Sequence, residues 1–155
     1  MIMPIPHARR MNLIPLALFI TALVAFAAFH LLPGFLIVAD EALPGWAMWT
    51  ILPELVEEMP GEPLIMIIFA SFITSAFLVL ACPFVAGALR RSRIAWWTVT
   101  ISSGAAFFGL SGILIYHLAL DPSWSASGIN CLAAAQMFQF LGLLFIRREL
   151  APDLP

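Results

Sequence analysis

The sequence has no lysine and few charged residues of any kind. Only 10% of its 155 residues are charged, whereas soluble domains average about 25%. All seven basic residues are arginines, and the formal net charge is −2. The chain therefore lacks the basic surface that nucleic-acid binding requires, and we expect no nucleic-acid partner.

Signatures of catalysis and metal binding are missing as well. Cys82 and Cys131 each lie inside an apolar run, which is typical of small hydrophobic residues rather than of a disulfide or a metal pair. The sequence contains no nucleophile elbow, zinc-protease motif or phosphate-binding loop. We expect no catalytic residues and no metal site, so a non-enzymatic protein is favoured over an enzyme.

Apolar residues, in contrast, are abundant. They make up 63% of the chain, and the mean hydropathy is +1.02, more apolar surface than a soluble core of this size can bury. Four segments have the length of a membrane span, about 20 residues, without an acidic or basic residue: about 12–32, 64–89, 94–120 and 124–146. The sequence predicts an all-α integral membrane protein, a single membrane domain over residues 1–155 folded as a four-transmembrane-helix bundle.

The charges predict how the spans are oriented. The arginines precede the first span, fill the turn between the second and third, and follow the fourth: Arg9, Arg10, Arg90, Arg91, Arg93, Arg147 and Arg148. The opposite side receives seven of the nine acids. By the positive-inside rule we expect a multi-pass protein of the inner (plasma) membrane with both termini cytoplasmic. The alternative for the first span is a signal peptide cleaved after Ala25-Phe26-Ala27, but the apolar run continues past that point.

An outer loop of about 30 residues, 33–63, separates the first two spans. Pro–Gly pairs mark turns along it, and the stretch from Trp46 to Met59 is expected to form a short interfacial helix interrupted near Pro53. Trp46 and Trp49 are three residues apart, which suits amphipathic rings at the level of the lipid headgroups. The alternative is a lid, or a docking surface on which Trp46 and Trp49 bind a partner or a lipophilic ligand.

Polar side chains inside the spans predict how the helices meet. Gln136 and Gln139 lie near the middle of the fourth span, where an unpaired amide is costly, so each should bond across a helix interface. Ser71, Thr74 and Ser75 lie at comparable depth in the second span. We therefore expect the second and fourth spans to pack with Gln136 against these hydroxyls. A ligand role for the two glutamines, on a quinone carbonyl or a lipid headgroup, is the alternative.

Two histidines carry a cofactor hypothesis. His30 and His117 lie near the outer ends of the first and third spans at matching depth. Facing imidazoles can ligate a haem iron from both sides, or a chlorophyll each. The simpler interpretation is a pair of interfacial histidines that reach the headgroups, so no cofactor is the first expectation and haem, pigment or quinone the alternative.

These patterns favour one class of function over two others. The leading hypothesis is a non-enzymatic accessory or assembly subunit that contacts membrane lipids and other integral membrane subunits. The first alternative is a redox or binding protein that holds haem, pigment or quinone near His30 and His117. The second is a small transporter, which the absence of charged residues from the spans disfavours.

Overall fold

The computed structural model describes residues 13–36, 42–120 and 127–146. Within this part the chain forms five α-helices: α1 (Leu13–Leu31), α2 (Met48–Glu58), α3 (Pro63–Arg91), α4 (Arg93–Leu120) and α5 (Ser127–Leu144). Two short antiparallel strands, β1 (Pro33–Leu36) and β2 (Ala42–Pro44), and a 3₁₀ turn, Gly45–Ala47, connect α1 to α2. Helices α1, α3, α4 and α5 are long and apolar enough to cross a membrane, as the sequence predicted.

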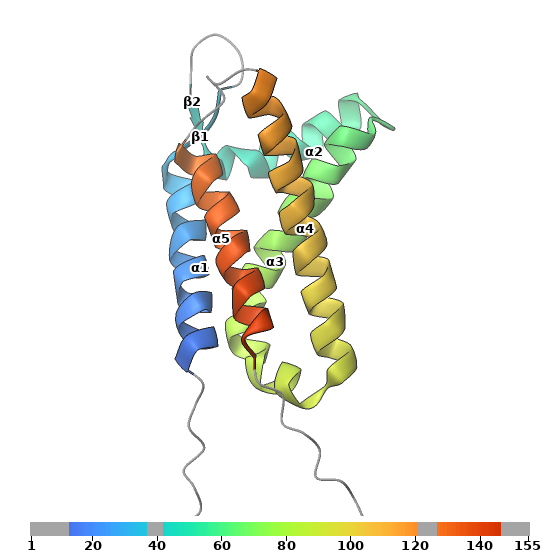
Figure 1. Ribbon diagram of the computed structural model, residues 1–155. Coiled ribbons are helices and arrows are strands. Elements are labelled where there is room, and N and C mark those ends of the chain that lie inside the picture. Colours follow the sequence, from blue (N-terminus) through green and yellow to red (C-terminus); the bar gives the residue numbers. More distant parts are fainter. Residues whose placement is uncertain (1–12, 37–41, 121–126, 147–155) are drawn as a thin grey trace, which may run out of the picture.

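The four long helices form an up-and-down bundle (Figure 1). Helix α1 packs chiefly along α5, and α3 packs along α4, while contacts between α4 and α5 and between α1 and α3 join the two pairs. The α3–α4 turn lies at the same end of the bundle as the start of α1 and the end of α5. We call this the arginine end, after Arg90, Arg91 and Arg93, and the opposite end the α2 end.

Local chemistry explains where α3 and α4 begin and end. Pro63 occupies the first helical position of α3, where its missing N–H leaves no bond unmade. Ser92 lies between α3 and α4, and its hydroxyl accepts a hydrogen bond from the N–H of Ala95 at 3.2 Å, a typical N-cap contact. The two spans are therefore joined by a turn of one residue.

The core of the bundle has two parts. Toward the α2 end, a larger cluster is built around Phe26, Phe29 and Phe72 and also includes Met48 and Leu52 of α2. Toward the arginine end, a smaller cluster surrounds Phe19, Trp96 and Leu143. The indole N–H of Trp96 donates to the carbonyl of Leu143 at 2.9 Å, which ties α4 to α5. Helix α2 is thus part of the buried core.

Two features of the outer loop differ from the sequence-based expectations. The helix expected to break near Pro53 runs without interruption from Met48 to Glu58, with Pro53 inside it. Pro53 removes only one backbone N–H of the helix, and burial of Leu52 before it and packing of Leu55 after it against the bundle hold both sides in line. The strand pair β1–β2 was not expected, because its Pro–Gly pairs indicated only turns.

The predicted span boundaries agree with the helices to within a few residues, except where they fall outside the described part. The first span was expected to begin near residue 12 and the fourth near residue 124, and both positions lie outside the described ranges. The fourth helix is described from Ser127.

Candidate functional site

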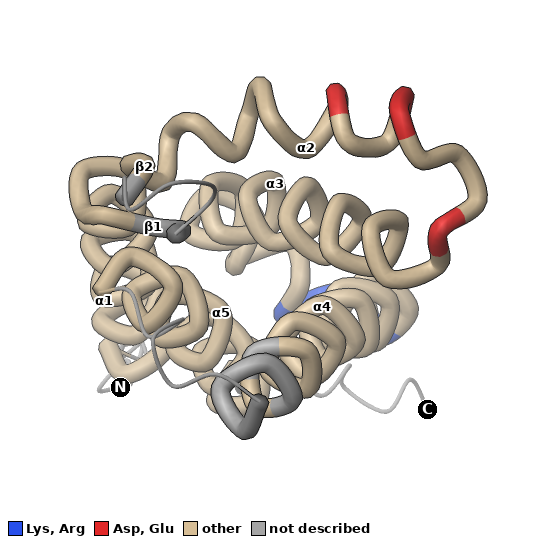
Figure 2. The backbone as a smooth tube through the Cα atoms, turned by 90° about the horizontal axis from the view of Figure 1, so that it is seen from above, with Lys and Arg blue, Asp and Glu red and all other residues tan. Residues whose placement is uncertain are grey.

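Helix α2 runs along one side of the bundle, at its α2 end, and lies against α3 (Figures 1 and 2). A set of rings fixes it there, which we call the aromatic anchor: Phe26, Phe29, His30, Trp49 and Phe72. The ring of Trp49 packs edge-on against Phe72 of α3 at 4.8 Å between centroids. Its indole N–H donates to Nε2 of His30 on α1 at 2.9 Å. One side chain of α2 therefore contacts two other helices.

The hydrogen bonds of His30 define its tautomer. Nδ1 lies 2.8 Å from the carbonyl oxygen of Phe26, and a carbonyl only accepts, so Nδ1 carries the proton. Nε2 is then the acceptor for Trp49. His30 is a neutral imidazole with both nitrogens engaged, and a metal ion at Nε2 would have to displace the indole of Trp49.

The proposed partner of His30 in cofactor binding was His117. His117 lies in the last turns of α4, and its side chain is outside the described part of the structure. The pairing of the two histidines therefore stays a prediction. In the described residues, no group of three or more His, Cys, Asp or Glu side chains is placed to hold a metal ion.

The connection into α2 leaves no spare room. A Cβ on Gly45 would overlap the carbonyl oxygen of Phe29 at the end of α1, and the N–H of Gly45 donates to the carbonyl of Leu32 at 3.2 Å. The start of α2 is thereby held against the end of α1. Gly61 follows α2 with a φ of 96°, a conformation that favours glycine, and directs the chain into α3.

The outward side of α2 is acidic. Glu54, Glu57, Glu58 and Glu62 are all exposed, and acidic positions follow the outer edge of the molecule in Figure 2. No basic residue lies in α2. The two tryptophans to which the alternative interpretation gave partner binding differ in their contacts: Trp49, 42% exposed, belongs to the aromatic anchor, whereas Trp46 is 58% exposed.

The glutamines of α5 pair with α3 in the interior. Nε2 of Gln136 donates to the hydroxyl of Ser75, which in turn donates to the carbonyl of Ser71 at 2.6 Å. Nε2 of Gln139 lies 3.7 Å from the sulfur of Cys82. The predicted contact between the second and fourth spans through Gln136 is therefore confirmed, and both amides serve to join helices.

Two buried polar atoms in the described part have no hydrogen-bond partner: Oε1 of Gln136 and the hydroxyl of Thr100. Gln136 is 2% exposed and Thr100 is 5% exposed. Neither of these two residues lines a described cavity.

A groove opens on the surface between α3 and α4. It consists of two adjoining hollows of about 330 and 360 Å³, which share Thr74 and Ser102. The other hydroxyls in it belong to Ser71 and Thr98, and the rest of its lining is apolar. Thr98 and Ser102 are difficult to single out from the sequence, since Ser and Thr are frequent in membrane helices. Their four-residue spacing, followed by Ala105, is the signal that points to them.

In comparisons with known proteins, no protein-family model, curated protein or solved structure matches the chain.

Proposed function

We propose that the protein is a non-enzymatic accessory or assembly subunit of a bacterial-type inner membrane, and that α2 is the element with which it docks to a partner subunit. In this proposal the arginine end lies in the cytoplasm, as the positive-inside rule predicts. Helix α2 then lies at the outer headgroup level, where an exposed indole such as that of Trp46 is stable.

The observation that carries the proposal is the way α2 is held. A free helix of 11 residues is only marginally stable in water, yet the aromatic anchor and two buried side chains of the core keep α2 in one position across α3. A helix fixed in this way presents its acids in a constant arrangement. Fixed surfaces of this kind bind partners at a lower entropic cost than mobile ones.

The charge of α2 indicates the kind of partner. Helices that bind anionic lipid headgroups carry arginine or lysine on their polar face, whereas α2 has exposed glutamates and no basic residue. An acidic outer surface favours a membrane subunit with a basic outer segment, because complementary charges guide association and suppress wrong partners. Contact with membrane lipids is made by the apolar sides of the four spans.

Photo-crosslinking in native membranes tests the proposal. With a photoreactive amino acid in place of Glu57 in the full chain, we expect covalent adducts with a second, different membrane protein, identified by mass spectrometry. The same probe at Val24, which is 65% exposed on α1, serves as the lipid-facing control. Replacing Glu54, Glu57 and Glu58 with Gln should reduce recovery of the partner, most clearly at low salt. If position 57 gives only lipid adducts and the triple variant changes nothing, the proposal is wrong.

The cofactor alternative has its own test. A visible absorption spectrum of the purified protein with a Soret or chlorophyll band, lost in His30→Ala or His117→Ala, would replace the accessory-subunit proposal. Transport would require substrate-dependent flux in liposomes, and the described spans offer it no charged residue between their ends.

A further inference from the structure

The outward face of α4 carries a regular alternation of large and small residues. Its large members stand seven residues apart and are strongly exposed: Ile94 81%, Ile101 63%, Phe108 64% and Ile115 69%. Between them lie Thr98, Ala105 and Gly112, which are also exposed. Together they follow one another at steps of four and three residues along 22 residues of helix (Ile94 to Ile115).

This alternation is the pattern of a helix that pairs with another helix. A heptad pattern of this kind lets two helices cross at a small angle with knobs in holes, and small residues at a membrane helix interface let the backbones approach closely. A face that meets only lipid gains nothing from small residues at every second contact position. In the described structure the ring of Phe108 contacts Phe140 of α5, with centroids 6.0 Å apart, yet every member of this face stays exposed.

The groove between α3 and α4 lies directly beside this face of α4, whose large residues we call the ridge, and the hydroxyl of Ser71 opens into the groove. Ser71 lines the groove and is only 7% exposed, and no hydrogen bond of its hydroxyl is found among the described residues. The hydroxyl is directed at α4, because a Cβ built on Gly109 would lie 3.2 Å from it. Near the middle of a membrane span no water is available to such a donor.

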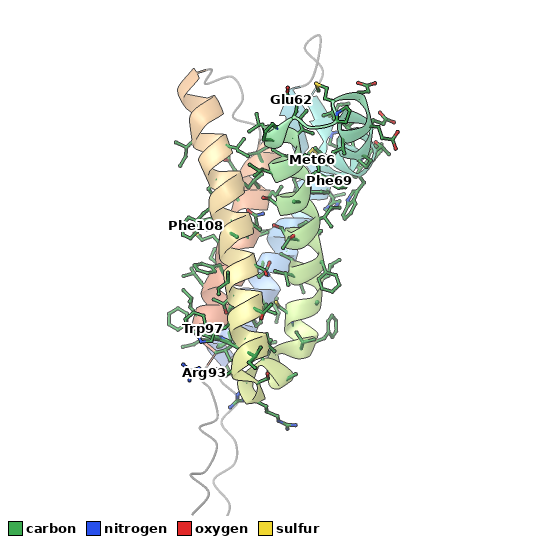
Figure 3. All side chains as sticks on the ribbon, turned by 90° about the vertical axis from the view of Figure 1, so that its right-hand side faces the viewer. Glu62, Met66, Phe69, Arg93, Trp97 and Phe108 are labelled. Atoms are coloured by element: carbon green, nitrogen blue, oxygen red, sulfur yellow. The ribbon has the colours of Figure 1, made fainter. Side chains whose placement is uncertain are left out.

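The ridge and the groove lie at the same depth in the bundle. Helices α3 and α4 are antiparallel (Figure 3), so the residue numbers of the groove lining rise along α3 as they fall along α4. The groove extends from Ile67 and Ala106 at one end to Leu78 and Thr98 at the other. That is 12 residues of α3, or about 16 Å from the first to the last. Ile101 and Phe108 stand beside it on α4, and Figure 3 shows Phe108 projecting outward.

We propose that this face binds a second copy of the chain, so that the protein is a two-fold symmetric dimer in the membrane. With the axis along the membrane normal, each residue meets its partner's surface at its own depth. Ile101 and Phe108 of each copy then enter the groove of the other, and the small residues of α4 allow the two α4 helices to approach. The groove hydroxyls of one copy then meet those of the other, and each hydroxyl can both donate and accept: Ser71, Thr74, Thr98 and Ser102.

The self-complementary arrangement favours this occupant over others. A phospholipid acyl chain brings no hydrogen-bond acceptor to the middle of the bilayer and has no use for the adjoining ridge. A quinone-like lipophile would accept from Ser71 but would also leave the ridge uncovered. Only a surface that has both a ridge and a groove at this depth matches both features, and a second copy has them by symmetry. The acids of α2 stay free, so this inference is independent of the proposed docking function.

Photo-crosslinking and dimer stability test the inference with the full chain. A photoreactive amino acid in place of Ile101, activated in native membranes, should give a covalent product of twice the 17.0 kDa chain mass, and the same probe at Val24 should not. In liposomes, two-step photobleaching should report dimers at low protein-to-lipid ratio. Ala105→Leu fills the path of the partner helix and should raise the dimer dissociation constant about ten-fold or more.

Ala27→Leu is the matched control, because Ala27 is likewise exposed on a long helix but lies on α1. It should leave the dimer unchanged. Both Leu variants should keep the helical circular dichroism of the parent protein, since neither side chain is buried in the monomer. Three outcomes would each overturn the proposal. The first is a monomer by photobleaching, and the second is a crosslink from position 101 to a different protein. The third is a co-purifying lipophile whose binding is abolished by Ala105→Leu while the protein stays monomeric.

Discussion

At the scale of single residues, His30 shows how one side chain determines the position of a whole helix. Its Nδ1–H is bonded to the carbonyl of Phe26, one turn earlier in α1, which orients the ring so that Nε2 faces Trp49. Rotation of the ring would break both bonds. The position of α2 therefore depends on a backbone carbonyl of α1 as much as on the residues of α2 itself.

Removing the indole donor should loosen α2. Trp49→Phe keeps an aromatic ring against Phe72 but loses the hydrogen bond to His30. A neutral hydrogen bond contributes about 0.5–1.5 kcal/mol to stability. We expect amide hydrogen exchange within residues 48–58 to become roughly two- to ten-fold faster. Trp46→Phe is the control, because Trp46 is largely exposed and lies outside the anchor. Equal exchange rates in both variants would show that the hydrogen bond does not hold α2.

Gln136 provides a second test at this scale. Gln136→Leu loses the bond to Ser75 but also removes the unpaired Oε1, so the free energy of unfolding should fall by no more than about 1 kcal/mol. Gln136→Glu places a carboxyl at a site that is 2% exposed and should cost more, roughly 2–3 kcal/mol. Reversible unfolding in bicelles measures both, with Met137→Leu as the neighbouring lipid-facing control. A larger loss for Leu than for Glu would contradict this account.

At the scale of elements, the pairing of α1 with α5 depends on a close approach at Gly142. A Cβ added there would lie 2.6 Å from the ring of Phe19, and Phe19 is 1% exposed, so the ring has no free space into which it can move. The first and last helices of the bundle thus meet at a point where only glycine fits.

Gly142→Ala should therefore destabilise the bundle by about 1–3 kcal/mol, the usual cost of overpacking. Gly87→Ala is the matched control, because nothing lies within 4 Å of its added Cβ. In a helix interior it should be neutral or slightly stabilising. The two unfolding free energies are measured in the same detergent. Equal values would mean that the contact between α1 and α5 accommodates a Cβ at position 142.

At the scale of the whole molecule, the two ends of the bundle differ in charge. Arg90, Arg91 and Arg93 lie at the arginine end, and the exposed glutamates of α2 and Glu62 lie at the other, as the labelled Arg93 and Glu62 show in Figure 3. The described helices thus separate the charges as the sequence pattern required for an even number of spans. Which end faces the cytoplasm is part of the proposed function, and it can be measured directly.

An alkaline phosphatase fused after Pro155 should be inactive, because the positive-inside rule retains the arginine end in the cytoplasm. A fusion after Met59, beyond α2, should be active, since this position lies at the α2 end. A cytoplasmic fluorescent reporter at the same two positions should give the opposite pattern. An active phosphatase at Pro155 would reverse the orientation and place α2 on the cytoplasmic side.

The sequence by itself determined the spans and the end of the bundle at which the charges of the described residues lie. Both follow from one-dimensional facts: an apolar run must be long enough to cross the hydrocarbon, and its flanks must carry the charges that the lipid excludes. The contact between Gln136 and Ser75 was also within reach of sequence reasoning, because an amide at that depth has few available partners. The prediction of an interruption at Pro53 was wrong because packing of Leu52 and Leu55, on either side of it, against the bundle outweighed a single lost N–H.

Only the tertiary structure decided which apolar faces meet. All sides of these helices are hydrophobic, so periodicity does not distinguish a side that faces lipid from one that faces a neighbouring helix. The pairing of α1 with α5, the use of both nitrogens of His30, and the ridge and groove along α4 arise from side chains far apart in sequence. Their packing depends on shape at the atomic scale, and hydropathy carries no information about shape.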